Sequence, residues 1–169
     1  MSSFKYVLDA NVFIQAKNQY YAFDLVPGFW NSLIRHAADG TIGSIDRVKQ
    51  ELVRGKDRLA DWAASHFSHA FSSTDEAGVI DAYRQVMSWV QHQAQFSDAA
   101  KADFASGADG WLVAYAIAKG HVVVTHEQLA PEAERNVPIP NVCKALNVRS
   151  VDTFAMLREL KVQLVERGG

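Results

Sequence analysis

Four acidic side chains stand beside apolar segments, where a solvated charge is seldom placed. Asp9 directly follows the apolar segment 5–8, and Glu127 comes two residues after the β-branched segment that ends at residue 125. Glu51 borders the apolar stripe of a helical pattern, and Asp109 shares a helical face with apolar residues three, four and seven positions further along. Because carboxylate oxygens are hard ligands that suit Mg²⁺ or Mn²⁺, these four residues are the candidate catalytic and metal-binding groups.

A cluster of carboxylates is costly without a counterion. Two like charges about 4 Å apart repel by roughly 4 kcal/mol at an effective dielectric constant near 20. One or two bound divalent cations would offset this repulsion, orient a phosphate, activate a water molecule and stabilise the departing oxygen. The acids therefore predict phosphodiester hydrolysis with Mg²⁺ or Mn²⁺ as the cofactor and no organic cofactor.

The elements that must position these acids alternate along the chain. β-like segments at 5–8, 41–44, 121–125 and 137–139 are separated or followed by helical patterns at 29–38, 45–54, 57–66, 79–90, 97–105, 109–119 and 151–164. This alternation predicts an α/β fold with a short central parallel sheet flanked by helices, and 57–66 with 79–90 is expected to form an inserted helical hairpin. Ligands of parallel sheets collect at the carboxyl ends of the strands, so Asp9 and Glu127 are expected on the same edge.

Several polar residues and glycines mark the predicted helix ends. Ser44 is expected to cap the helix 45–54, and Ser97 the helix that ends near residue 105. Ser73 and Glu76 stand at capping-box spacing before the longer helix. Gly120 is expected to close the helix 109–119.

Composition limits the class of protein. A chain of 169 residues with 49% hydrophobic residues is long enough for one compact core, which predicts a single domain over 1–169. No run approaches the roughly 20 apolar residues of a membrane span, so we expect a cytoplasmic protein without membrane contact. The formal charge of −2 gives no overall attraction for nucleic acid. The lone Cys143 is expected in the core.

Three sequence blocks occur in an order that resembles the PIN domain. They are "LDANVFI", "SIDRVKQELVRG" and "ADGWLVAYAIAKGHVVVTHE", and the resemblance covers residues 4–127. PIN domains are a fold of metal-dependent nucleases that includes the toxin ribonucleases of bacterial toxin-antitoxin pairs. The resemblance implies a PIN-like fold, an endoribonuclease activity with Mg²⁺ or Mn²⁺, RNA as the substrate and a protein antitoxin as the partner, and it allows a homodimer.

The resemblance also assigns roles by position. Asp9, Glu51 and Asp109 match the three principal acids of the family, whereas Glu127 stands where the family usually has Asp. Asn11 matches a polar position two residues after the first acid. Apart from the resemblance, Asp103 could join the cluster, although an exposed helical acid explains it better.

Local positive charge surrounds one of the acids. The segment "RVKQELVRGKDR" carries five cations near Glu51, namely Arg47, Lys49, Arg54, Lys56 and Arg58. We take Asn11, Lys49, Arg54 and His126 as the candidate substrate-binding residues, since the cations could grip RNA phosphates and His126 adjoins Glu127. The alternatives are a solvated helix surface for the cations and a structural role for the histidine.

Two other functions fit part of the pattern. A haloacid-dehalogenase-like phosphatase also begins with a strand and Asp, but its second Asp, the general acid, is here Asn11. A catalytically inactive PIN-like protein that only binds a partner would tolerate the departure at Glu127. RNA is favoured as the substrate by the resemblance alone, and DNA remains an alternative.

Overall fold

The computed structural model describes residues 5–166 and contains an all-parallel central sheet. Its strands are β1 (Tyr6–Leu8), β2 (Ile42–Ile45), β3 (Phe71–Ser72), β4 (Val122–Val124) and β5 (Ser150–Val151), in the order β3-β2-β1-β4-β5. The predicted α/β class with a short parallel sheet between helices is confirmed. Residues 1–4 and 167–169, which belong to the predicted domain 1–169, lie outside the described residues.

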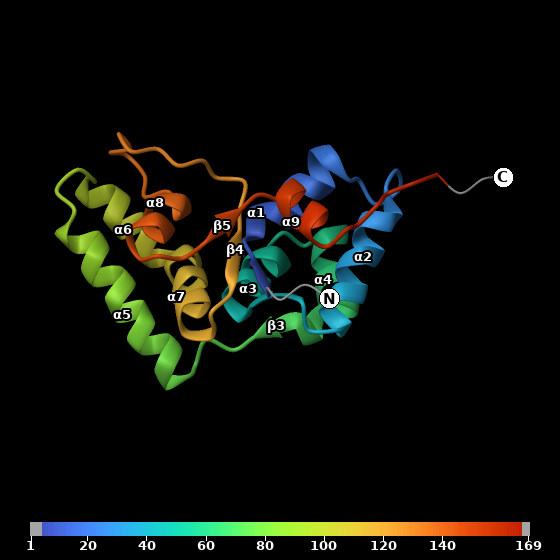
Figure 1. The fold of residues 1–169 in the computed structure, drawn as a ribbon, viewed down its shortest axis with the longest axis horizontal. Coiled ribbons are helices and arrows are strands. Elements are labelled where there is room, and N and C mark those ends of the chain that lie inside the picture. The colour runs from blue at the N-terminus through green and yellow to red at the C-terminus, as the bar shows by residue number, and fades with distance from the viewer. Residues whose placement is uncertain (1–4, 167–169) are drawn as a thin grey trace.

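Helices cover both faces of the sheet. They are α1 (Ala10–Gln15), the π-helix η1 (Ala16–Tyr20), α2 (Pro27–Ala38), α3 (Asp46–Arg54), α4 (Arg58–His66), the 3-10 turn η2 (Ser68–Ala70), α5 (Ala77–His92), α6 (Asp98–Ser106), α7 (Asp109–Lys119), α8 (Ile139–Ala145) and α9 (Thr153–Glu159). Figure 1 shows α5 to α8 on one side of the sheet and α2, α4 and α9 on the other. Within residues 5–166, no helix combines the length and the apolar character that a membrane span requires.

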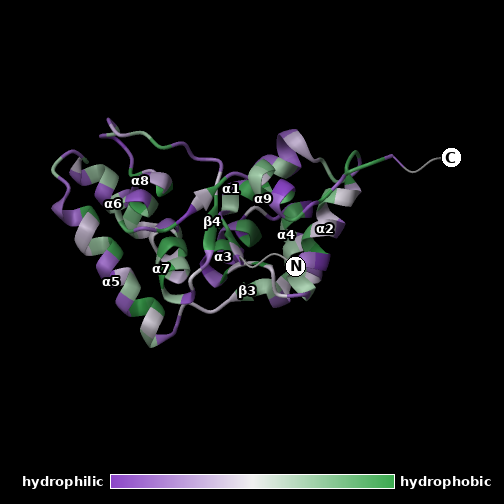
Figure 2. Cartoon of the chain, viewed as in Figure 1, coloured by the Kyte–Doolittle hydropathy of each residue, from purple (hydrophilic) through white to green (hydrophobic). Residues whose placement is uncertain are grey.

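The two central strands are buried on both faces. Every residue of β1 and β4 is at most 4% exposed. Apolar runs without polar alternation are typical of parallel strands covered by helices on each side. Figure 2 shows β4 and much of α7 in the hydrophobic colour at the middle of the molecule. The segments that carry Asp9 and Glu127 therefore start from strands that are buried on both faces.

The segment after β1 is helical, although the sequence pattern predicts no helix between residues 9 and 28. Residues 10–20 are helical as α1 and η1, and only residues 21–26 connect them to α2. Val12, Phe13 and Ala16 are each at most 1% exposed and share a helical face. The sequence does not reveal this short helix because its stability comes from packing on the core and not from caps or helix propensity.

The expected strand at 137–139 is wrong. Ile139 is instead the first residue of α8, and Pro140 lies in its first turn, where proline is tolerated because the amide has no helical partner. The fifth strand is instead Ser150–Val151, and the closing helix is shorter than the predicted 151–164. Strand β3 was also missed. Two-residue strands carry too little pattern to be recognised without their pairing partners.

The expected helical hairpin of 57–66 and 79–90 is also not formed. Both segments are helical, as α4 and α5, but α4 packs mainly on α3 and α5 packs mainly on α7. Strand β3 lies between them in the chain and joins the sheet beside β2. The two helices consequently end on opposite sides of the molecule (Figure 1).

Two of the predicted caps have other partners. Ser44 does not cap α3, because its Oγ donates to the Leu8 carbonyl at 2.6 Å and ties β2 to the end of β1. Glu76 begins α5 without a capping hydrogen bond and forms an ion pair with Lys119. The caps expected at Ser97 and Gly120 are confirmed: Ser97 accepts from the Ala100 amide, and Gly120 has a φ of 70°.

Candidate functional site

The register of β1 and β4 places Asp9 beside Thr125. Leu8 pairs with Val124, and the Asp9 amide donates to the Val124 carbonyl at 2.9 Å. Thr125, the residue that follows β4, donates from Oγ1 to Asp9 Oδ2 at 2.9 Å. Asp9 is 2% exposed and Thr125 is 3% exposed, so this carboxylate is held in the protein interior at the carboxyl edge of the sheet.

Burial and neighbouring acids make Asp9 hard to ionise. The pKa of Asp9 rises from 3.8 to about 7, first because burial removes water from the carboxylate and then because of the charges of Glu127 and Glu51. The hydrogen bonds from the Thr125 hydroxyl and the Ala10 amide act in the opposite direction. A carboxyl group with this pKa binds a proton or a cation readily at neutral pH.

Asp109 has a similar environment at the first residue of α7. Its pKa rises from 3.8 to about 8 because of burial, followed by the charges of Asp9, Glu127 and Glu51. Asp103, on the exposed side of α6, adds a smaller repulsion. The structure therefore places Glu51 and Glu127 within electrostatic range of both aspartates, and Asp103 within range of Asp109.

The two glutamates are held by backbone amides. Glu51 Oε1 accepts from the Ala108 amide at 3.3 Å, immediately before α7. Glu127 Oε2 accepts from the Ile139 amide at 2.6 Å, at the start of α8. Burial raises the pKa of Glu127, while the Ile139 hydrogen bond opposes that rise. Glu51 thus joins α3 to the start of α7, and Glu127 joins the segment after β4 to the start of α8.

The chemistry of these donors fits a divalent cation that prefers oxygen. The ion pairs found among residues 5–166 involve other carboxylates, so the mutual repulsion at Asp9 and Asp109 is not offset by a lysine or arginine in direct contact. In the same residues, no group of three or more His, Cys, Asp or Glu side chains is placed so that it could hold a metal ion, so a shared ion would require the acids to move closer together. Each glutamate uses one carboxylate oxygen for its backbone amide, which leaves the other oxygen available to a cation.

The predicted substrate-binding residues are less closely grouped. Asn11 lies in the first turn of α1, two residues after Asp9, and His126 immediately precedes Glu127. Lys49 instead donates to Ser68 Oγ at 3.2 Å, and Arg54 is exposed at the end of α3. No ion pair within residues 5–166 joins either cation to the four acids.

Sequence reasoning missed contacts that connect distant segments. Thr125 has no motif of its own, and only its place at the end of a β-like run opposite Asp9 could have indicated its role. Arg47 lies 4.0 Å above the Trp111 ring, whose plane stacks on Tyr83 at 3.8 Å. One cation of the basic segment is therefore used to join α3, α7 and α5.

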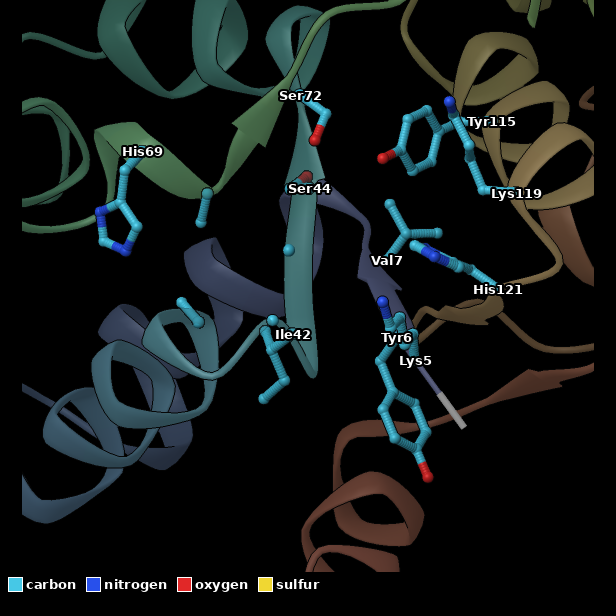
Figure 3. Close-up of a pocket in the computed structure, with 14 residues that line it drawn as sticks. Lys5, Tyr6, Val7, Ile42, Ser44, His69, Ser72, Tyr115, Lys119 and His121 are labelled. Atoms are coloured by element: carbon cyan, nitrogen blue, oxygen red, sulfur yellow. The ribbon is translucent and has the colours of Figure 1, made fainter. Parts of the chain in front are cut away.

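A cavity of about 340 Å³ lies apart from the acids (Figure 3). Lys5, Ile42 and His121 stand at the amino ends of β1, β2 and β4 and contribute to its lining. Figure 3 also shows Lys119 and Tyr115 of α7 at this cavity. Because Asp9 and Glu127 follow the carboxyl ends of β1 and β4, the cavity is not the place of the candidate site.

Comparisons with known proteins agree with this fold. A family model described as "Domain of unknown function (DUF4411)" matches residues 6–164. The crystal structure of VapBC2 from Rickettsia felis, bound to a DNA fragment from its promoter, is 17% identical with a TM-score of 0.54 over 87% of this chain and 97% of that chain. FitAcB from Neisseria gonorrhoeae is 20% identical with a TM-score of 0.53 over 86% and 95%. No curated protein sequence matches the chain. The likeness to the two solved structures confirms the PIN-like fold.

Proposed function

The chain belongs to the family described as a domain of unknown function (DUF4411), and we propose that it is a metal-dependent endoribonuclease, the toxin of a toxin-antitoxin pair. The observation that carries this proposal is the convergence of Asp9, Glu51, Asp109 and Glu127 at the carboxyl edge of a parallel sheet. Burying such a cluster costs stability in the empty protein. A functional ligand that requires several hard oxygen donors accounts for that cost.

The roles of the acids follow from their surroundings. Asp9 and Asp109, whose carboxyl groups have the most raised pKa values, would hold Mg²⁺ or Mn²⁺ most directly, and Glu51 and Glu127 would complete the site. When bound, the cation would polarise the scissile phosphate and lower the pKa of an attacking water. Thr125 keeps the Asp9 carboxylate in a fixed orientation through its hydrogen bond.

The choice of RNA as the substrate and of a toxin as the role rests on the resemblance to PIN-domain toxins. The PIN-like sequence blocks and the likeness to VapBC2 and FitAcB support a toxin whose partner is an antitoxin. An antitoxin that covers the acidic edge of the sheet would keep the enzyme inactive. The candidate substrate-binding residues Asn11, Lys49, Arg54 and His126 would position RNA around the acids.

The activity is tested with purified protein and labelled single-stranded RNA. We expect cleavage with Mg²⁺ or Mn²⁺, none in EDTA, and none with Asp9→Asn at any metal concentration. Asp61→Asn, which changes an exposed acid on α4, is the matched control and should cleave normally. RNase activity that persists undiminished in EDTA would contradict the proposal.

The toxin role needs a separate test in cells. Expression of the wild type should arrest bacterial growth, whereas Asp9→Asn should not, and co-expression of a cognate partner should restore growth. Normal growth of the native host with active enzyme would reject the toxin role and leave the nuclease activity standing.

A further inference from the structure

Three aromatic side chains, Tyr20, His126 and Phe154, meet next to the acidic site, and we call them the aromatic cluster. We propose that this cluster stacks an unpaired base of single-stranded RNA while the backbone passes over the acids. The inference rests on the proposed function for its substrate, and it adds a binding subsite and a selectivity for unpaired strands.

The rings are in the geometries that aromatic groups prefer. The centroids of Tyr20 and His126 are 5.8 Å apart with 29° between the planes, and Tyr20 meets Phe154 edge-on at 5.6 Å and 86°. Offset and edge-to-face pairs of this kind are favourable. Tyr20 is nevertheless 47% exposed, which leaves much of its surface available to a ligand.

Such exposure is unusual for an aromatic residue in this molecule. Within residues 5–166, the other large hydrophobic residues that are exposed are aliphatic, namely Leu25, Val53, Leu129, Leu164 and Val165. The other tyrosines and the tryptophans and phenylalanines of this range are at least partly buried. An exposed aromatic ring supported by two further rings is an arrangement that can accept the flat face of a base.

The cluster lies at the same edge of the sheet as the acids. Tyr20 ends the helical segment that begins directly after Asp9, and His126 and Phe154 follow the carboxyl ends of β4 and β5. His126 also stands between Thr125, which donates to Asp9, and Glu127. The π-helical turn that ends at Tyr20 is a geometry often found at functional sites.

The supporting side chains are held in place before any ligand binds. Thr153, which is 1% exposed, lies with its Oγ1 2.9 Å from Nε2 of His126. Tyr21, next to Tyr20, stacks on the buried Phe29 at 4.3 Å and 9°. A fixed platform loses little conformational entropy on binding.

These features select a single strand over a duplex. A base in a duplex is already stacked on its neighbours, whereas an unpaired base can place one face on Tyr20. Arg158 is exposed one helical turn after Phe154 on α9 and offers a cation to a backbone phosphate. Stacking does not depend on base identity, so the subsite should favour unpaired RNA without strong sequence preference.

Binding is measured on full-length protein that carries Asp9→Asn, so that RNA is not cut. Loss of one stacked base corresponds to about 1–3 kcal/mol, or roughly 5- to 150-fold in Kd. We expect Tyr20→Leu to weaken the binding of single-stranded RNA by this factor and to leave the affinity for duplex RNA of the same sequence unchanged. Tyr20→Phe should bind like the parent, and so should the control Leu25→Ala, which changes an exposed aliphatic residue in the following loop.

A set of RNAs with one abasic nucleotide each then locates the base. One abasic position should weaken binding to the Asp9→Asn parent, and the same position should cause no further loss in Tyr20→Leu. Equal affinity of Tyr20→Leu and the parent for single-stranded RNA would overturn the inference. It would also be overturned if, at every position, the abasic nucleotide weakened binding to Tyr20→Leu as much as it weakens binding to the parent. A Tyr20→Leu variant that binds RNA normally but no longer binds the cognate antitoxin would assign the cluster to the protein partner instead.

Failure of this inference can be separated from failure of the proposed function. If the wild type does not cleave RNA but Tyr20→Leu still weakens single-strand binding, the nuclease proposal fails and the stacking subsite stands. If the wild type cleaves RNA and Tyr20→Leu binds and cleaves single strands normally, only the subsite is wrong.

Discussion

Thr125 Oγ1 donates a hydrogen bond of 2.9 Å to Asp9 Oδ2, and both residues are almost completely buried. They are 116 positions apart in the chain and meet because β1 and β4 are parallel neighbours. The same hydroxyl accepts from the Glu127 amide at 3.1 Å. One threonine therefore joins the first predicted acid to the segment that carries the fourth.

Replacing Thr125 should reduce the stability of the folded protein. Thr125→Val leaves the buried Asp9 carboxylate and the Glu127 amide without this partner, which should cost about 1–3 kcal/mol in the free energy of unfolding. Thr125→Ser keeps the hydroxyl and should lose much less. Urea denaturation at pH 8 measures both variants, and equal stability of Thr125→Val and wild type would show that the hydrogen bond contributes nothing.

The raised pKa values of Asp9 and Asp109 predict how stability depends on pH. Both groups have a folded pKa, about 7 and about 8, above the unfolded value of 3.8, so the folded state binds protons more tightly. Stability of the metal-free protein should therefore fall as the pH rises from about 5 to about 8, by up to about 1.4 kcal/mol per unit and per carboxyl group. Thermal melts in EDTA between pH 5.5 and 8.5 measure this slope.

A divalent cation should reverse that trend, because it competes with protons for the same carboxylates. With saturating Mn²⁺, stability should rise or stay level as the pH increases through 7–8. Asp9→Asn should reduce the slope in EDTA, whereas Asp61→Asn should not. The same slope in wild type and Asp9→Asn would mean that Asp9 does not titrate in this range.

Removing the charge of Asp9 should have opposite effects on the stability of the metal-free protein and on its stabilisation by Mn²⁺. Asp9→Asn should stabilise the metal-free protein slightly, since it removes a buried and repelled carboxylate. At a Mn²⁺ concentration 100 times the Kd, the wild type should gain about 2.7 kcal/mol, or roughly 5–10 °C in Tm. Asp9→Asn should gain little, and an equal Mn²⁺ shift in both proteins would place the cation elsewhere.

Glu127 should be the most dispensable ligand. Its longer side chain has more rotamers to fix than that of Asp9, and one of its oxygens already accepts from the Ile139 amide, so it should bind a cation more weakly than Asp9. We expect Glu127→Ala to lose cleavage at limiting Mg²⁺ and to recover partly at saturating Mg²⁺, while Asp9→Ala stays inactive. Glu127→Asp should retain activity if the shorter side chain still reaches a metal-bound water. A metal titration of the cleavage rate compares the variants, and unchanged kinetics in Glu127→Ala would remove this residue from the site.

The parts of the fold that the sequence predicts are those with local causes. Helix α7 has an apolar stripe and ends at Gly120, whose left-handed conformation suits glycine. The strands β3 and β5 have two residues each and exist through pairing, as between Ser44 and Phe71. Such elements depend on neighbours that the local sequence does not reveal.

The same distinction applies to the site. The four acids could be selected as candidates because an acid beside an apolar pattern is visible locally, and their role as ligands stays a prediction. Their surroundings could not, since the hydrogen bond of Thr125 and the meeting of Tyr20 with Phe154 arise from segments that are distant in the chain. The glutamates illustrate the limit: their backbone partners, Ala108 and Ile139, come from other elements of the fold.

The most direct measurement is the position of Mn²⁺ in crystals of the full chain, found by anomalous scattering. We expect a peak coordinated by Asp9 and Asp109, with a carboxylate oxygen of Glu51 or Glu127 also bound to the ion, and no such peak in Asp9→Asn crystals. A wild-type protein that cleaves RNA with Mn²⁺ but binds the ion away from Asp9 and Asp109 would contradict the metal site proposed here.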